Sequence, residues 1–244
     1  AMSECDVMIC VGARFDDRVT GRLDAFAQKS KKIHIDIDPS SINKNVPVDI
    51  PIVGDVGHVL EDMLKVWKST ARKLDKKANA SWWATIAKWR ERDCLKYLPG
   101  KDIAKPQYVL ETLQKAVDGK DAYVTTDVGQ HQMWAAQYLK FQDPNRWLTS
   151  GGLGTMGYGL PAAIGAQVAH PKSPVICVTG ESSFMMNIQE LSTAVQYRLP
   201  VKILLLNNRY MGMVRQWQEL LHGNRYSESY MESLPDFAKV ADAF

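Results

Sequence analysis

The feature that most constrains the fold of this chain is a repeated alternation of short apolar runs and helical patterns after residue 104. The runs fall at 123–126, 147–149, 174–178 and 201–206, and the helical patterns that follow them at 130–139, 161–169, 184–198 and 211–221. Strands that alternate with helices of this length are typical of a parallel sheet covered by helices on both faces. We therefore predict an α/β fold with a doubly wound parallel sheet in this part of the chain.

The first part of the chain shows a shorter version of the same pattern. Residues 7–11 predict a buried strand, 32–39 a second strand stopped by Pro39, and 46–53 a weaker third one. A helical pattern follows at 58–67. We therefore predict two doubly wound parallel-sheet domains, at 1–67 and 104–244, joined by a linker and helix at 68–103.

Composition excludes several classes of protein. The 30 Lys and Arg against 27 Asp and Glu leave a net charge of +3, too balanced for a chain whose main partner is nucleic acid. The basic stretch 68–77, followed by Trp82 and Trp89, allows single-stranded nucleic-acid binding as an alternative, but helical spacing favours packing. No apolar run approaches the roughly 18 residues of a spanning helix, so we expect no membrane partner.

The four cysteines and the N-terminus point to a reducing compartment. None of the cysteines forms a C-x-x-C pair, so a structural zinc or a secreted disulfide framework is not expected. Glu4 and Asp6 stand where a signal peptide would carry positive charge. We therefore expect the protein in the cytoplasm.

Polar and glycine-rich turns follow all four strands predicted after residue 104. They are residues 127–131, 150–157, 180–183 and 207–208. Ligands of such sheets bind at the carboxyl ends of the strands, where free N–H groups at helix starts favour a diphosphate. Glu181 and Asn208 offer the oxygen ligands that Mg²⁺ prefers. The alternative is that the glycines only turn the chain and that Asn and Ser cap helices.

The residues at these turns resemble a known family. Gly180-Glu181-Ser182, with Asn207-Asn208 downstream, is similar to the thiamine-diphosphate motif written G-D-G, spacer, N-N. The strings at 151–166, 183–208 and 211–230 resemble the large catalytic subunits of the acetohydroxyacid (acetolactate) synthases, and those at 12–21, 34–45 and 54–56 resemble their flavin-binding middle domain. The resemblance implies a partial FAD-binding domain at 1–67 and a thiamine-diphosphate-binding domain, truncated at its C-terminus, at 104–244.

The resemblance also implies a role for each matching residue. Those expected at thiamine diphosphate are Gln130, His131, Gly154, Met156, Ser182 and Ser183; those at the metal are Glu181, Asn208 and the carbonyl of Tyr210. Those expected at FAD are Gly12, Ala13, Arg14, Phe15, Asp36, Ile37, Asp55 and Val56, and those on the substrate side are Arg18 and Trp217. As alternatives, Met156 and Trp217 are packing residues, Asp36 is a helix cap and Arg18 is a solvated surface residue.

The implied activity is decarboxylation of pyruvate followed by carboligation with a second 2-keto acid, pyruvate or 2-ketobutyrate, in isoleucine and valine biosynthesis. The implied cofactors are thiamine diphosphate, Mg²⁺ and FAD. The implied partners are further copies in a homodimer or higher homo-oligomer and a small regulatory subunit. Another thiamine-diphosphate-dependent decarboxylase or carboligase, or a non-catalytic nucleotide-binding or assembly module, stays open as an alternative.

Two departures from the family pattern stand out. Glu181 replaces the aspartate of the motif, which lengthens the side chain by one methylene. In addition, nothing in the sequence matches the N-terminal domain whose glutamate activates the cofactor in the family. We therefore expect this polypeptide to be a fragment without synthase activity of its own.

Overall fold

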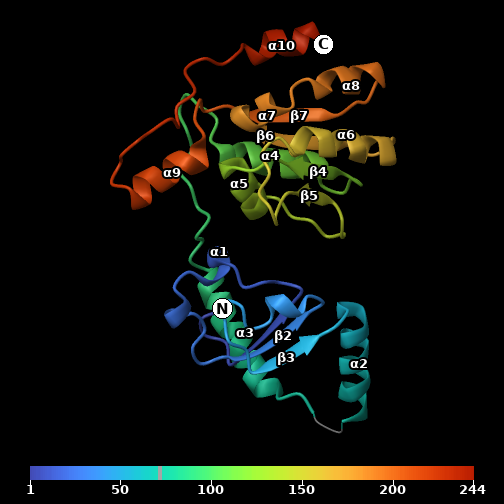
Figure 1. Ribbon diagram of the computed structural model, residues 1–244, viewed down its shortest axis with the longest axis vertical. Coiled ribbons are helices and arrows are strands. Elements are labelled where there is room, and N and C mark those ends of the chain that lie inside the picture. The colour runs from blue at the N-terminus through green and yellow to red at the C-terminus, as the bar shows by residue number, and fades with distance from the viewer. Residues whose placement is uncertain (71–72) are drawn as a thin grey trace. The chain divides into compact units, whose positions relative to one another are not determined.

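A computed structural model describes residues 1–70 and 73–244, which form two compact units, Ala1–Cys94 and Leu95–Phe244 (Figure 1). Each unit contains one parallel sheet and its own helices, so the predicted α/β class with two parallel-sheet domains is confirmed. The finer division at 67 and 104 stays a prediction, and residues 71–72 of the predicted linker lie outside the described residues. No helix in the described ranges is long and apolar enough to cross a membrane.

The first unit is built on three parallel strands in the order β1-β2-β3. The elements are β1 (Val7–Val11), α1 (Asp17–Thr20), the 3-10 turn η1 (Leu23–Ala25), β2 (Lys31–Asp36), the 3-10 turn η2 (Pro39–Ser41), β3 (Ile50–Val53), α2 (Val56–Ser69) and α3 (Lys76–Arg90). The first strand has the predicted bounds, but the prediction that it is buried was wrong, because Val7, Ile9 and Val11 are exposed on one face. The third strand begins four residues later than the 46–53 run suggests. The buried cluster of this unit consists of Cys10, Phe15, Phe26, Ala27 and Val46.

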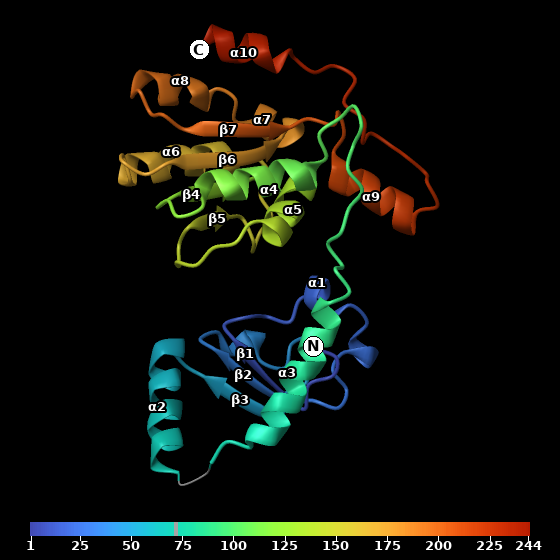
Figure 2. The same ribbon diagram turned by 180° about the vertical axis from the view of Figure 1, so that it is seen from behind.

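The second unit is built on four parallel strands in the order β5-β4-β6-β7 (Figure 2). Its elements are α4 (Pro106–Val117), β4 (Tyr123–Thr126), α5 (Gln130–Tyr138), β5 (Trp147–Thr149), α6 (Gly159–Ala169), β6 (Val175–Gly180), α7 (Glu181–Met186), α8 (Glu190–Gln196), β7 (Lys202–Leu206), α9 (Gly212–Leu221) and α10 (Phe237–Ala243). The chain leaves β4 toward β5 on one side and leaves β6 toward β7 on the other. The direction of winding therefore reverses between β4 and β6, where a sheet of this kind binds its ligands.

Helices cover both faces of the second sheet because its central strands are apolar on both sides. Along β6, Val175 and Cys177 pack in one cluster with residues of α6, α7 and α8, while Ile176 and Val178 pack in another with residues of α4 and α5. This alternation follows from the two-residue period of a strand. The sheet is thereby held rigidly behind the turns at its carboxyl edge.

One predicted element was wrong. The helical pattern at 184–198 is not one helix: α7 begins earlier, at Glu181, and ends at Met186, and α8 begins at Glu190. Asn187 interrupts the helix, and its side-chain Nδ2 donates a hydrogen bond to the carbonyl of Gly157, 2.6 Å away. A contact with a loop distant in sequence therefore sets this break.

Candidate functional site

The turns after β4 and β6 lie side by side because these strands are neighbours with Thr126 paired to Val178. The turn after β4 leads through Gly129 into α5, and β6 leads directly into α7 at Glu181. The turn after β7 joins them from the other side of β6. Because β5 pairs in parallel with β4 on its other side, all four predicted polar turns are neighbours along the carboxyl edge of the sheet.

Glu181 and Asn208 meet at one backbone N–H group. The N–H of Tyr210 donates to Glu181 Oε1 at 2.8 Å and to Asn208 Oδ1 at 3.0 Å. The Glu181 side chain is buried, with a residue exposure of 2%, and burial raises its pKa, although nearby backbone N–H groups oppose the rise. The structure therefore brings together the acid and the amide that the sequence predicts as metal ligands.

The chemistry of this donor set suits a hard cation. Carboxylate, amide and backbone carbonyl oxygens are ligands that Mg²⁺ accepts, usually together with water and substrate phosphates. The described residues contain no group of three or more His, Cys, Asp and Glu side chains placed to hold a metal. A cation here would therefore depend on the amide of Asn208 and on backbone oxygens besides the single carboxylate of Glu181.

His131 is enclosed between two glycines. A Cβ added at Gly129 would lie 2.8 Å from His131 Cε1, and one added at Gly180 would lie 3.0 Å from His131 Nδ1. Gly129 also has φ +152°, which side-chain-bearing residues rarely adopt. Burial lowers the pKa of His131 to about 4, so the imidazole is neutral at pH 7, and its buried Nε2 has no hydrogen-bond partner among the described residues.

Some of the hydroxyl and amide side chains around this edge have hydrogen-bond partners within the protein, and one does not. Ser183 Oγ donates to the carbonyl of Val128 at 3.2 Å, and Gln130 Nε2 donates to Gln216 Oε1 on α9 at 3.0 Å. Ser182 Oγ is buried and has no hydrogen-bond partner in the described part of the chain. Buried polar atoms without partners are uncommon, and the Ser182 hydroxyl, which can donate, fits a site completed by an oxygen-rich ligand such as a diphosphate.

The glycine loop, residues 150–158, connects β5 to α6 and carries Gly154 and Met156. Gly154 has φ +70°, a conformation that favours glycine, and Leu153 beside it is 95% exposed. Met156 is half-buried. The loop also bonds within itself, since Ser150 Oγ accepts from the N–H of Thr155 at 2.9 Å.

The two residues predicted on the substrate side lie in different units. Trp217 is half-buried on α9, one residue from Gln216, which bonds to Gln130. Arg18 is exposed on α1 in the first unit. The structure thus ties α9 to the polar edge of the second sheet, whereas the role of Arg18 stays a prediction.

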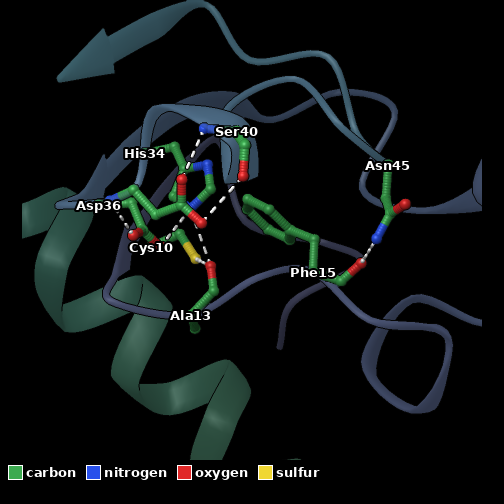
Figure 3. A network of polar contacts seen from close by, with 8 residues as sticks. Cys10, Ala13, Phe15, His34, Asp36, Ser40 and Asn45 are labelled. Carbon is green, nitrogen blue, oxygen red and sulfur yellow. Dashed lines mark hydrogen bonds and ion pairs between the residues drawn. The ribbon is translucent and has the colours of Figure 1, made fainter. Parts of the chain in front are cut away.

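The residues predicted at FAD gather at the carboxyl edge of the first sheet. Gly12, with φ +63°, turns the chain after β1, and the carbonyl of Ala13 accepts from Cys10 Sγ at 2.9 Å and from His34 Nε2 at 2.8 Å (Figure 3). Phe15 packs edge-on against His34 with ring centroids 5.1 Å apart, and Asn45 donates to its carbonyl at 3.0 Å. Hydrogen bonds and ring packing therefore hold the turn after β1 in place.

The neighbouring strand ends supply the other predicted residues. Asp36 ends β2, and its Oδ1 accepts from the N–H of Asp38 at 2.9 Å. Asp55 caps α2 by accepting from the N–H of His58 at 3.2 Å. Ile37 is 69% exposed, so an apolar side chain is available at this edge. Three strand ends, a glycine turn and an acid fit a nucleotide-binding edge.

Two buried titratable residues, His34 and Asp127, were not among the site residues predicted from the sequence. His34 is fully buried on β2, opposite Cys10 of the neighbouring strand β1. Its Nδ1 has no hydrogen-bond partner among the described residues. Asp127 is fully buried directly after β4 and was predicted only as part of a polar turn. The sequence pattern that could have identified both residues is a titratable residue within, or directly after, a buried strand.

Comparison with known proteins agrees with this arrangement. The model of the thiamine pyrophosphate enzyme C-terminal TPP binding domain matches residues 127–244, and that of the thiamine pyrophosphate enzyme central domain matches residues 1–63. The chain belongs to the thiamine pyrophosphate enzymes. The C-terminal model thus covers the three polar turns that meet beside β6, and the central-domain model covers the edge around Gly12 and Asp36.

The chain is also similar over its whole length to individual members of this family. The chain is 54% identical over 243 residues to the acetolactate synthase isozyme 3 large subunit of Escherichia coli. It is 50% identical over 244 residues to the acetolactate synthase large subunit of Haemophilus influenzae, and 53% over 246 residues to that of Pyropia yezoensis. These matches cover 100% of this chain but only 41–42% of each relative, so the chain spans less than half the length of the proteins it matches.

Proposed function

We propose that this chain forms the FAD-binding and thiamine-diphosphate-binding parts of an acetolactate synthase large subunit. The observation that carries the proposal is the Tyr210 N–H shared by Glu181 and Asn208, beside the buried, unpartnered hydroxyl of Ser182. The full-length similarity to acetolactate synthase large subunits supports the choice of this enzyme among thiamine pyrophosphate enzymes.

In this proposal the second unit holds thiamine diphosphate and Mg²⁺. Glu181, Asn208 and the carbonyl of Tyr210 bind the metal, and Gly154 and Met156 lie beside the rings of the cofactor. The diphosphate is held by Gln130, His131, Ser182 and Ser183. When bound, the cofactor supplies an electron sink for decarboxylation and for carbon–carbon bond formation.

The residues of this chain act by binding and orientation. Burial lowers the pKa of His131 to about 4, so its side chain is neutral at pH 7 and adds no positive charge beside the diphosphate. The starts of α5 and α9 add free N–H groups near the anion. Trp217 on α9 lines the side where the 2-keto acids enter.

The first unit holds FAD in a mainly structural role through the eight residues predicted above, and Arg18 lies near the substrate. The substrates are pyruvate and a second 2-keto acid, pyruvate or 2-ketobutyrate, in the route to isoleucine and valine. The whole enzyme is a homodimer or higher homo-oligomer in the cytoplasm and works with a small regulatory subunit.

In the deciding experiment, calorimetry measures the binding of thiamine diphosphate to the 244-residue chain, once in the presence of Mg²⁺ and once in the presence of EDTA. We expect binding that requires Mg²⁺ and that weakens at least tenfold in Asn208→Ala. Asn79→Ala, an exposed change of the same kind on α3, is the matched control and keeps the affinity. An affinity for thiamine diphosphate that is unchanged both by EDTA and by Asn208→Ala would contradict the proposed metal site.

Two further observations separate the alternatives. FAD absorbance in the purified chain favours an acetolactate synthase over another thiamine-diphosphate-dependent carboligase.

We also propose that the isolated chain forms no acetolactate from pyruvate, because the activating glutamate of the family comes from a domain that no residue here matches. Acetolactate formation by the isolated chain would overturn this second statement.

A further inference from the structure

Asp127 is a fully buried acid at the point where the winding of the second sheet reverses. It follows β4 directly, and its Oδ2 accepts a hydrogen bond from Thr179 Oγ1, 2.9 Å away on β6. Thr179 is also fully buried. This side-chain pair therefore links the carboxyl ends of the two strands that flank the candidate site.

The beginning of α6 packs directly onto this pair. A Cβ added at Gly159 would lie 2.8 Å from Asp127 Oδ2 and 3.0 Å from its backbone nitrogen, so only glycine allows the approach. The carbonyl of Gly159 accepts from Thr125 Oγ1 at 2.8 Å. Burial raises the pKa of Asp127, and the backbone N–H groups of Gly159, Gly157 and Tyr158 oppose that rise.

A second contact holds the same segment from another element. Asn187, at the break between α7 and α8, donates from Nδ2 to the carbonyl of Gly157 at 2.6 Å. Gly157 has φ +86°, and a Cβ there would lie 2.7 Å from Asn187 Nδ2. The end of the glycine loop is therefore held between β4, β6 and α7, while Gly154 is in an exposed part of that loop.

A helix cap with a purely structural role is usually supplied by the residue just before the helix. The residue at the start of α6, Tyr158, makes no side-chain capping bond, and the carboxyl that interacts with the N–H groups there belongs to Asp127, after β4. The Asp127 carboxyl is fully buried and interacts with the backbone N–H groups of Gly157, Tyr158 and Gly159, although its Oδ1 has no hydrogen-bond partner of good geometry among the described residues. A buried acid that is not fully hydrogen-bonded requires an explanation beyond helix capping.

We propose that Asp127, through Thr179 and Gly159, is a positioning residue that fixes the glycine loop so that Gly154 and Met156 are presented to thiamine diphosphate. The carboxylate of Asp127 satisfies the start of α6 from within the protein, because a negative charge is favourable there. The diphosphate is therefore bound by the turns after β4, β6 and β7 and not by the start of α6. The statement about the cofactor rests on the proposed function, whereas the statement about the loop does not.

The test measures hydrogen exchange in the full chain and in three variants, Asp127→Asn, Thr179→Val and Thr179→Ser. In Asp127→Asn and Thr179→Val we expect the amides of residues 157–159 to exchange at least tenfold faster, while those of 202–206 in β7 are unchanged. Thr179→Ser keeps the hydroxyl and should behave as the unaltered chain. Unchanged exchange at 157–159 in Thr179→Val, or an equal effect of Thr179→Ser, would overturn the proposal.

Titration of thiamine diphosphate with Mg²⁺ gives the second readout. Asp127→Asn and Thr179→Val should weaken binding about fivefold or more, and Thr179→Ser should restore it. If exchange changes as expected but the unaltered chain binds no thiamine diphosphate, the proposed function fails and the positioning of the loop stands. If the unaltered chain binds the cofactor and all three variants bind it equally, the role of Asp127 toward the cofactor is refuted. Should Asp127→Asn not fold, the two Thr179 variants decide.

Discussion

Glu181 is longer by one methylene, about 1.5 Å, than the aspartate of the motif it resembles. Because Mg²⁺ demands near-ideal octahedral geometry at roughly 2.0–2.1 Å, the longer side chain has to bend or displace the ion. One carboxylate oxygen is also engaged by the N–H of Tyr210. We expect Glu181→Asp to bind thiamine diphosphate about threefold to tenfold more tightly at fixed Mg²⁺, measured by calorimetry. Glu61→Asp, an exposed change on α2, is the control, and equal affinities of the Glu181→Asp and unaltered chains would refute the expectation.

His131 should make stability depend on pH. Its folded pKa of about 4 lies below the unfolded value of about 6.5, so its contribution is complete above pH 6.5 and is lost as the pH falls toward 4. In urea unfolding, the stability advantage of the unaltered chain over His131→Asn should therefore shrink by up to about 3 kcal/mol between pH 7 and pH 4. A difference that is independent of pH would contradict the buried, neutral state of His131.

The residues of the candidate site differ in how far the sequence could predict them. Glu181 and Asn208 follow predicted strands, and the rule that ligands bind at the carboxyl ends of strands was sufficient to predict that they would be neighbours. Asp127 follows a strand equally closely, but only the packing of Gly159 against it distinguishes it from an ordinary turn residue. His34 was missed because a buried histidine within a strand has no distinctive spacing in the sequence.

At the scale of elements, the close contact between β6 and α5 depends on a glycine. A Cβ at Gly180 would lie 3.0 Å from His131 Nδ1 and 3.2 Å from Cε1, so we expect Gly180→Ala to destabilise the chain by about 1–3 kcal/mol in urea unfolding. Gly165→Ala is the control: it lies on α6 with no atom within 4 Å of the new Cβ, and should stabilise by about 0.5–1 kcal/mol. In a His131→Ala background the cost of Gly180→Ala should largely vanish, and an undiminished cost would rule out the contact as its cause.

The strands were easier to predict than the helix boundaries. The runs at 7–11, 123–126 and 147–149 match β1, β4 and β5, because a short apolar run between turn residues marks a strand within one or two residues. The break between α7 and α8 contains no glycine or proline from which a helix end could be predicted. It depends on the hydrogen bond from Asn187 to Gly157, and a contact between residues 30 positions apart leaves no local pattern in the sequence.

At the scale of the whole molecule, the two units differ in how well their sheets are covered. The second sheet has a buried cluster on each face, whereas the first has one small cluster. On β1, Val7 and Ile9 are each 49% exposed and Val11 is 41% exposed, and these alternate positions share one face. Since burial of apolar area is the main stabilising contribution, at roughly 25 cal/mol per Å², the first unit should be the less stable one.

Native-state hydrogen exchange at increasing urea concentration would measure this difference directly. We expect amides of β1 and β2 to open at lower urea and with a smaller free energy than those of β4 and β6, because proteins open in cooperative units of different stability. Ile35→Val and Val178→Ala, both at fully buried positions, test the assignment: the first should accelerate exchange in the first sheet and the second should do so in the second sheet. Equal opening free energies in β1, β2, β4 and β6 would show instead that the chain unfolds as one cooperative block.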